Sequence, residues 1–465
     1  MFISTLFNRM DTEILSRIQF AFTIAFHYIY PPISIGLGVL LVIMEGMYVK
    51  TKNKTYEHIT KFWIKIFALV FAMGVATGIV MEFEFGTNWA TYSRFVGDVF
   101  GSALAAEGIF AFFLESGFLA ILVFGWNRVS TKMHFFSTIM VSLGAMLSAV
   151  WIIVANSWQQ TPAGHHIVNN AGILRAEIID FWAMIFNPSS VDRLTHTLSA
   201  AWLTGAFLVL SVSAYYLLKN KHLDFSKKSI KIALGLAMFA SLFQLFTGHQ
   251  SAVGISVNQP AKLAAFEGHY NTSPAPLYLF GWVDDSQQKV NFGVSVPGML
   301  SYLVHGDSKT SIVGLNEFRK EDRPPVNLVF QSYHLMVAIG MILIGISSLS
   351  IIMLRKEKLF KSKIMLKVLV LSVLLPQAAN QLGWMSAEVG RQPWIVYNLL
   401  RTKDALSKSV TGSEVLFSLI LFLLIYALLF ILFLFLLDRK IKHGPDISDN
   451  SDDVYSSQKG MLNKN

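Results

Sequence analysis

The chain has 465 residues, of which 53% are hydrophobic and only 14% are charged, and its mean hydropathy is +0.50. Soluble domains carry roughly 25% charged residues, so this composition excludes a soluble, disordered, collagenous or nucleic-acid-binding protein. The formal net charge of +9 points, in so apolar a chain, to the cytoplasmic loops of a membrane protein. There is no cysteine, which excludes disulfides and thiolate-bound metals. Any metal must therefore be held by His, Met or carboxylate.

About nine apolar segments have the length of about 20 residues that crosses roughly 30 Å of hydrocarbon. They lie near residues 20–48, 62–82, 103–125, 134–156, 194–218, 230–250, 329–354, 364–386 and 413–437. The first contains polar residues throughout and lacks a basic segment before it, so it does not have the pattern of a cleavable signal peptide. The sequence therefore predicts an all-α integral membrane protein with about nine transmembrane helices.

Lys and Arg residues cluster in the odd-numbered connections, from Lys50, Lys52 and Lys54 after the first segment to Arg439 and Lys440 after the ninth. Because basic loops stay in the cytoplasm, the N-terminus is predicted to lie outside and the C-terminus inside. The expected organisation is helices one to six in residues 1–250, an outer loop in 251–328, helices seven to nine in 329–437 and a disordered cytoplasmic tail in 438–465. A long loop of this kind is either functional or a tolerated insertion.

Ionisable residues inside apolar segments are costly and usually functional. His27 lies in the first segment, Glu107 and Glu115 in the third, and Glu388 at the end of the eighth. On an ideal helix the two glutamates are roughly 80° apart around the axis and about 12 Å apart along it. They form either two steps of a proton path or two neutral carboxyl groups that are hydrogen-bonded to neighbouring helices.

Further candidate metal ligands converge on the outer ends of the segments. His196 begins the fifth segment, and His334 and Met336 lie just inside the start of the seventh. His, Met and carboxylate are the axial haem ligands available without cysteine, although a lone His or Met in a helix is more often a core residue. The paired membrane histidines of four-helix b-type cytochromes and of haem–copper oxidases are absent from the sequence.

Several segments resemble a known family. They are SRIQFAFTIAFHYIYPP, KFWIKIFALVFAMGVATGIVMEFEFGTNW, AEGIFAFFLES, SAVWIIVANSWQQTP, LTHT, QPAKLAAFEG, YHLMVAIG and GWMSAEVGRQPW. In order and spacing they are similar to subunit I of cytochrome bd quinol oxidase, and the similarity runs from about residue 12 to 437. The GRQPW motif is fairly specific by itself.

This resemblance implies a haem-containing terminal oxidase that oxidises membrane quinol, ubiquinol or menaquinol, at the outer face and reduces dioxygen to water. Water formation would take cytoplasmic protons, so that turnover would build a proton gradient without pumping. The implied location is the bacterial cytoplasmic (inner) membrane. The implied partners are a second large membrane subunit (subunit II) and, in some members, a small single-helix subunit.

The resemblance also implies roles for individual residues. His196 and Met336 would be the axial pair of a low-spin haem b, while His27 and Glu388 would each ligate one of two high-spin haems, a haem b and either a haem d or a further haem b. Which of the two haems each residue holds stays open. The proton route would contain Glu107, Glu115 and Ser148, and the quinol site Lys262 and Glu267. Trp384, Arg391 and Arg17 would line or support the haem cluster.

The sequence departs from the family pattern at three places. The outer loop corresponds to the short form of this loop. His334 stands two positions before Met336, where some members have Arg, so the sequence leaves open whether it ligates iron or hydrogen-bonds a haem propionate. Residues 248–253, GHQSAV, replace acidic residues of other members and are similar to the cyanide-insensitive branch.

Two other functional classes remain open from the residues themselves. A secondary transporter would use Glu107 and Glu115 as proton-coupling carboxylates, but such folds usually contain inverted repeats and helices broken at mid-membrane. A non-catalytic membrane scaffold is the third class, and the His, Met and Glu residues at every haem position of the family argue against it.

Overall fold

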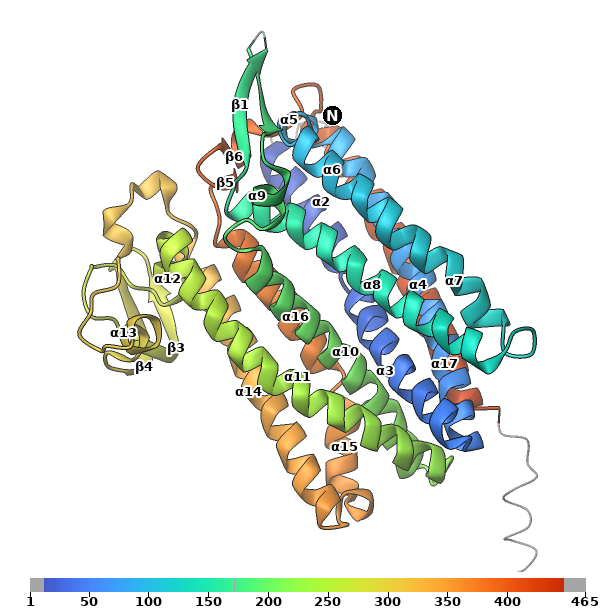
Figure 1. Ribbon diagram of the computed structural model, residues 1–465. Coiled ribbons are helices and arrows are strands. Elements are labelled where there is room, and N and C mark those ends of the chain that lie inside the picture. The colour runs from blue at the N-terminus through green and yellow to red at the C-terminus, as the bar shows by residue number, and fades with distance from the viewer. Residues whose placement is uncertain (1–11, 171, 447–465) are drawn as a thin grey trace, which may run out of the picture.

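The computed structural model describes residues 12–170 and 172–446. Within these residues, nine helical spans are long and apolar enough to cross a membrane. They are Thr12–Thr51, Lys54–Thr87, Gly97–Phe124, Thr131–Gln160, Ser190–Leu218, Leu223–Asn258, Lys320–Arg355, Lys363–Val389 and Gly412–His443. The predicted all-α membrane architecture is confirmed, and the helices form one elongated bundle (Figure 1).

The elements follow one another with short connections on one side of the bundle and longer ones on the other. In chain order they are α2 (Thr12–His27), α3 (Tyr30–Thr51), α4 (Lys54–Thr87), α5 (Ala90–Phe95), α6 (Gly97–Glu107), a π-helix (Gly108–Phe112), α7 (Phe113–Phe124), α8 (Thr131–Gln160), β1 (His165–Asn170), β2 (Ile173–Ile178), α9 (Phe181–Ile185), α10 (Ser190–Leu218), α11 (Leu223–Asn258), α12 (Pro260–Phe266), β3 (Leu277–Asp284), β4 (Lys289–Val296), α13 (Met299–His305), α14 (Val326–Arg355), α15 (Lys363–Leu371), α16 (Leu374–Val389), β5 (Trp394–Val396), β6 (Leu400–Arg401) and α17 (Gly412–His443).

Four of the nine spans are interrupted, the seventh only near its start, between a 3-10 turn at Lys320–Asp322 and α14. The first breaks after His27 and resumes at Tyr30, because Pro31 and Pro32 lack the N–H that a continuous helix needs and fit the first turn of α3 instead. The third contains the π-helix between α6 and α7, and the eighth breaks between α15 and α16. Two of these breaks lie next to predicted site residues, since His27 ends α2 and Glu107 ends α6.

The bundle packs most tightly around α10, in which 83% of the most apolar 18-residue segment is buried. Gly36 of α3 and Gly205 of α10 allow the two backbones to touch: a Cβ at Gly36 would lie 2.2 Å from the carbonyl oxygen of Ala201. In contrast, only 17% of the most apolar 18-residue segment is buried in α14, in α17 and in the α6–α7 span. These three spans are therefore available to lipid or to other subunits.

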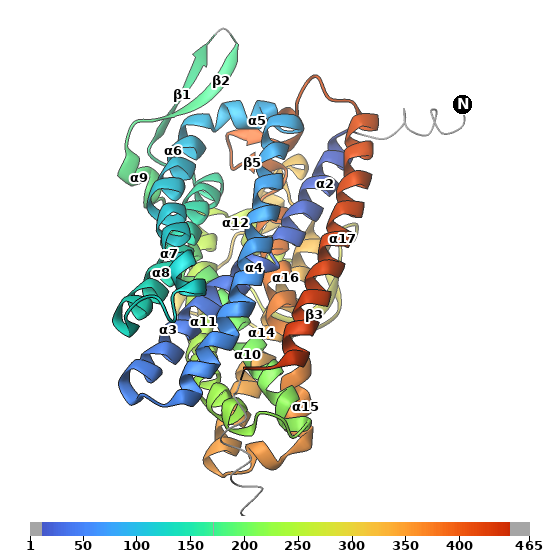
Figure 2. The ribbon, with the colours of Figure 1, turned by 90° about the vertical axis from the view of Figure 1, so that its right-hand side faces the viewer.

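The longer connections carry three antiparallel hairpins that the sequence did not predict: β1–β2, β3–β4 and β5–β6. We call the side that bears them the predicted outer face, because the distribution of basic residues predicts its orientation (Figure 2). Two predicted boundaries shift. The sixth span continues to Asn258, so the outer loop begins later, and α17 continues to His443. Most of the predicted tail, 447–465, lies outside the described residues.

Candidate functional site

A cavity of about 2260 Å³ runs between the spans. Pockets for single small molecules are usually about 300–1,000 Å³, so this cavity has room for more than one large ligand. Eleven of the predicted site residues line it: Arg17, His27, Glu107, Glu115, Ser148, His196, Lys262, Met336, Trp384, Glu388 and Arg391. The structure therefore gathers into one cavity residues that are up to 374 positions apart in the chain (from 17 to 391). Glu267 lies instead in the core of the outer loop.

His27 is oriented by its neighbour α4. Its Nδ1 lies 2.9 Å from Oγ1 of Thr77, and the hydroxyl of Thr77 donates to the carbonyl oxygen of Met73 at 2.8 Å. Because that hydroxyl proton is engaged, Thr77 accepts from Nδ1–H, which leaves Nε2 as the acceptor nitrogen of the ring. Gly78 faces the same ring, and a Cβ there would lie 3.3 Å from Cε1.

His196 has the same surroundings on a different pair of helices. Its Nδ1 lies 3.1 Å from Oγ1 of Thr247, which donates to the carbonyl oxygen of Gln244. A Cβ at Gly248 would lie 3.4 Å from Cε1 of His196. The amide nitrogen of Gln244 lies 2.9 Å from Nε2 and 3.2 Å from Nδ1, so this side chain contacts both nitrogens of the ring. A Thr–Gly dipeptide thus supports each histidine, one on α4 and one on α11.

Met336 and His334 lie on opposite sides of α14. Two residues along a helix turn by about 200°, and only Met336 of the two lines the cavity, with Sδ against Gly383 of α16. His334 faces the outer loop: its Nδ1 lies 2.9 Å from the carbonyl oxygen of Phe330 and its Nε2 3.0 Å from that of Tyr278. The sequence left the role of His334 open, and this geometry directs it away from the ligand cavity.

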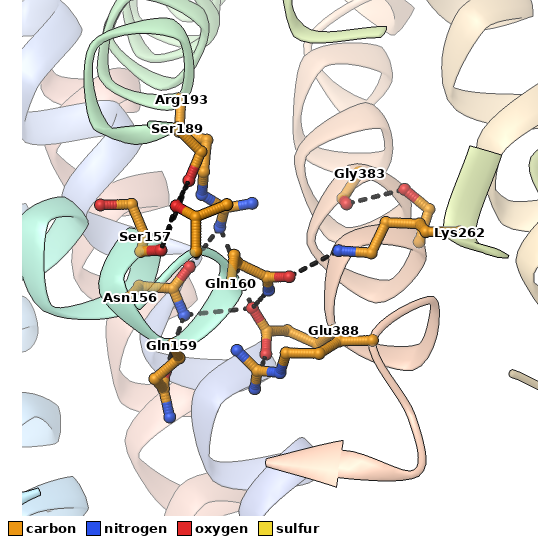
Figure 3. A network of polar contacts seen from close by, with 12 residues as sticks. Asn156, Ser157, Gln159, Gln160, Ser189, Arg193, Lys262, Gly383 and Glu388 are labelled. Carbon is orange, nitrogen blue, oxygen red and sulfur yellow. Dashed lines mark hydrogen bonds and ion pairs between the residues drawn. The ribbon is translucent and has the colours of Figure 1, made fainter. Parts of the chain in front are cut away.

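Glu388, near the end of α16, is the centre of a polar network (Figure 3). Its Oε1 accepts hydrogen bonds of 3.1 Å from the side-chain amides of Asn156 and Gln160. Its Oε2 accepts from Arg391 at 2.5 Å, and Arg193 lies 4.0 Å from Oε1. The carboxylate is thereby fixed to α8, to α10 and to the turn that follows α16.

The same network holds more positive than negative charge. Lys262 donates to Gln160 and to Gln259, both at 2.5 Å, so that two arginines and a lysine lie around the single carboxylate of Glu388. Burial, together with nearby Arg193 and Arg391, lowers the pKa of Lys262 well below its usual value. Among the described residues, Nε of Arg193 and one terminal nitrogen of Arg391 have no hydrogen-bond partner. This donor set matches ligands that carry carboxylate groups.

Glu107 and Glu115 flank the π-helix of the third span. Oε1 of Glu107 accepts a hydrogen bond of 2.8 Å from Ser148 of α8, and Glu115 packs against Gly144 of the same helix. A single π-turn adds one residue, so eight residues turn like seven, by about 700°, which is within about 20° of two full turns. The predicted separation of roughly 80° is therefore wrong, and both carboxyl groups lie on nearly one face.

Glu267 follows α12 and is buried in the outer loop. Its Oε2 accepts from the backbone N–H of Tyr278 at 3.2 Å and lies 3.8 Å from Nε2 of His334, while its Oε1 has no hydrogen-bond partner among the described residues. Burial raises the pKa of Glu267 to about 8. The structure does not join Glu267 to Lys262, because the two side chains contact different groups.

The ligand chemistry of the cavity fits haem better than a metal held by protein alone. In residues 12–170 and 172–446 no group of three or more His, Asp or Glu side chains could bind a metal ion together. Instead, single His, Met and Glu side chains project into a large and mainly apolar cavity that also contains unpaired cationic donors. A porphyrin needs just one or two axial ligands and has propionates that pair with Arg.

Comparisons with known proteins agree with this fit. The sequence profile of the family described as cytochrome bd terminal oxidase subunit I matches residues 15–445. This chain belongs to that family. Cytochrome bd ubiquinol oxidase subunit 1 of Bacillus subtilis (strain 168) is 40% identical over 456 residues, covering 96% of each chain. Cytochrome bd-II ubiquinol oxidase subunit 1 of Escherichia coli (strain K12) is 33% identical and covers 88% of this chain and 92% of the relative.

A solved structure supports the same assignment. The bd oxidase from Geobacillus thermodenitrificans matches with a TM-score of 0.88 and 29% sequence identity, covering 94% of this chain and 100% of the matched one. As a cytochrome bd subunit I, the protein is a multi-pass membrane subunit of a terminal quinol oxidase, an enzyme class that uses haem cofactors and a quinol substrate.

Several residues of this cytochrome bd subunit were missed by sequence reasoning. They are the supporting Thr77 and Thr247, and the network partners Asn156, Gln160 and Arg193. The repeated Thr–Gly dipeptide was the one available signal for the first pair. The amides gave no signal, because Asn and Gln at a helix end are usual surface residues.

Proposed function

We propose that this chain is the haem-binding catalytic subunit of the oxidase, with the iron ligands in the cavity described above. In this proposal His196 and Met336 bind a low-spin haem b, and His27 and Glu388 each bind one of two high-spin haems, a haem b and a haem d or further haem b. The observation that carries the proposal is the pair of Thr–Gly supports, which fix the acceptor nitrogen of His27 and of His196 in the same way.

Bound haem iron would supply one-electron transfer and dioxygen binding, which no side chain of this chain can supply. The side chains position it and balance its charge. Arg193 and Arg391 would neutralise haem propionates, since their two positive charges exceed the single negative charge of Glu388. Trp384 and Arg17, which also line the cavity, would contact the haem faces or edges.

We further propose that Glu115, Glu107 and Ser148 carry protons to the dioxygen-reducing haem. Ser148 holds Glu107 by a hydrogen bond, and the π-helix brings both carboxyl groups to nearly one face. A carboxyl group can pass protons on by binding one and releasing another. These protons would come from the cytoplasm, at the end of the bundle opposite the predicted outer face.

Quinol oxidation is assigned to the outer loop, where Lys262 and Glu267 would have different tasks. Glu267 has an unpartnered Oε1 and would accept a proton from a quinol hydroxyl. Lys262, hydrogen-bonded to Gln160, would link the loop to the network around Glu388. The released protons leave at the predicted outer face, so turnover builds a proton gradient across the bacterial cytoplasmic membrane without pumping.

The proposed complex contains subunit II and, as in some family members, a small single-helix subunit. The weakly buried spans α6–α7, α14 and α17 provide surfaces for such partners. The test is oxygen consumption and external acidification by the purified complex in proteoliposomes. With quinol as donor we expect one proton released outside for each electron. A ratio of two would show pumping, and no quinol-dependent oxygen uptake would contradict the proposed function.

A further inference from the structure

The β3–β4 hairpin of the outer loop exposes a cluster of large apolar side chains. Phe280 and Trp282 of β3 are each 58% exposed, and Phe292 of β4 is 93% exposed. Leu279, Val294 and Val296 are exposed beside them. A contiguous apolar surface of this kind on a folded protein usually marks an interaction with a membrane or another protein.

Phe292 is unusual in its backbone as well. Trp282 pairs with Asn291 and Phe280 with Val294, so the single residue Gly281 lies opposite both Phe292 and Gly293. This is a β-bulge, and Phe292 adopts a left-handed conformation within it, with φ of 51°. A bulky residue rarely adopts positive φ. Phe292 thus combines a strained backbone with an apolar ring that is exposed to solvent, and both cost free energy.

The opposite face of the hairpin packs on the core of the loop. Val283 is 3% exposed, and the ring of Tyr278 lies 6.1 Å from that of Phe330. The turn between the strands is polar, with the sequence Asp284, Asp285 and Ser286 followed by two glutamines. The hairpin thus has a buried face, a polar tip and an exposed apolar face.

Contacts with α14 fix the depth of this hairpin. Asn327 accepts from the backbone N–H of Val283 at 3.1 Å, and Gln331 donates to the carbonyl oxygen of Gly281 at 2.7 Å. Helix α14 has 30 residues, which extend about 45 Å, whereas the hydrocarbon core is about 30 Å thick. With Arg355 at the predicted inner side, residues 327–331 would lie at the level of the outer lipid headgroups.

Both overall views show where the hairpin lies relative to the helices. In Figure 1, β3 and β4 lie beside the outer end of α14 rather than beyond it, and in Figure 2, β3 lies well below α5 and the β1–β2 hairpin. The first turns of α14, which contact the hairpin, also expose apolar side chains, including Leu328 and Leu335.

We propose that the β3–β4 hairpin is an interfacial membrane anchor whose Phe280, Trp282 and Phe292 side chains insert into the outer leaflet. Aromatic residues favour this boundary, because their apolar rings enter the lipid while their polar atoms stay hydrated. The anchor holds the outer loop at the depth from which a lipid-soluble substrate arrives. We infer this anchor from the membrane position of α14 and not from the proposed redox chemistry.

The absence of native cysteine allows a direct test. The Phe292→Cys variant of the intact complex carries a nitroxide label in vesicles of phosphatidylethanolamine and phosphatidylglycerol. Electron paramagnetic resonance then measures label collisions with oxygen, which concentrates in lipid, and with a water-soluble nickel chelate. Gln287→Cys, at the polar tip of the same hairpin, is the matched control. A complex without introduced cysteine, treated in parallel, corrects for labelling of other subunits.

We expect the label at position 292 to collide several-fold more with oxygen than with the chelate, and the label at 287 to show the reverse. Equal access of the chelate to both positions would overturn the proposal by placing the hairpin in water. Protection of position 292 from both reagents would overturn it in favour of a covering protein. Phe280→Cys gives a second label with the same expectation if the change at 292 prevents assembly.

Discussion

Oγ1 of Thr247 lies 3.1 Å from Nδ1 of His196, within hydrogen-bonding distance of the imidazole. The relationship recurs 2.9 Å apart between Thr77 and His27. In both cases a glycine follows the threonine and leaves room for the ring. When the threonine oxygen accepts from Nδ1–H, Nε2 keeps the lone pair that can bind a metal, and removing such support usually weakens metal binding by about 10- to 100-fold.

We therefore expect Thr247→Val to lower the affinity for the low-spin haem by about tenfold or more, because valine keeps the volume but cannot accept the hydrogen bond. The measurement is the low-spin haem content of the purified complex by absorption spectroscopy. Thr60→Val is the matched control, since Thr60 is a buried threonine of α4 that donates to the backbone of Tyr56. Equal haem loss in both variants would show a general packing defect.

Gly78→Ala tests the space around His27. The new methyl group would lie 3.3 Å from Cε1 of the ring and would displace it by a few tenths of an ångström. Alanine is favoured over glycine within a helix by up to about 1 kcal/mol, so thermal stability should not fall. We expect less haem on His27, measured as high-spin haem content. Gly235→Ala, where nothing lies within 4 Å of the added Cβ, should leave haem content unchanged.

Ser148→Ala removes the hydrogen bond to Glu107 without changing the cavity greatly. A hydrogen bond to a charged group contributes about 1.5–3 kcal/mol, so we expect oxygen reduction with an artificial reductant to slow roughly tenfold. Haem spectra should remain normal. Ser137→Ala is the control, because Ser137 is a buried serine of the same helix that donates to the backbone of Met133. Unchanged turnover of Ser148→Ala would remove Ser148 from the proton route.

The pKa of Glu267 predicts a pH dependence for quinol oxidation. Burial raises this pKa from 4.5 to about 8, so below pH about 8 the carboxyl group is mainly protonated and cannot accept a proton. The rate with quinol should therefore rise as the pH increases through about 8, and this rise should be absent in Glu267→Gln. Turnover with an artificial reductant serves as the control. The same rise in both proteins would exclude Glu267 as the proton acceptor.

The overall fold was predictable because each membrane span is a long apolar run: eight of the nine predicted runs lie within the observed spans, and the third extends one residue beyond its span. The breaks were less predictable. Pro31 and Pro32 signal the first break, but no residue type signals the π-helix at Gly108–Phe112. That helix changes the relative direction of Glu107 and Glu115, so ideal helical geometry gave the wrong angle between them.

The site was predictable to the extent that its chemistry is carried by rare residues. His, Glu and Arg within apolar runs stand out, whereas the hydroxyl and amide side chains that orient them do not. The sequence did not indicate one buried ionisable pair: Glu45 of α3 lies 2.6 Å from His134 of α8 and also accepts from Thr138. This pair is self-contained and joins α3 to α8. Glu45 and His134 are 89 positions apart in the chain, so only the packing of α3 against α8 brings them together.

His196 is the proposed ligand of the low-spin haem in the cavity. The most direct test is the reduced-minus-oxidised absorption spectrum of the purified complex carrying His196→Ala, compared with the unmodified complex and with His134→Ala, which alters a buried histidine outside the cavity lining. We expect His196→Ala to lose the low-spin haem b signal and to retain the high-spin signals. An intact low-spin signal in that variant, or an unmodified complex without haem bands, would contradict it.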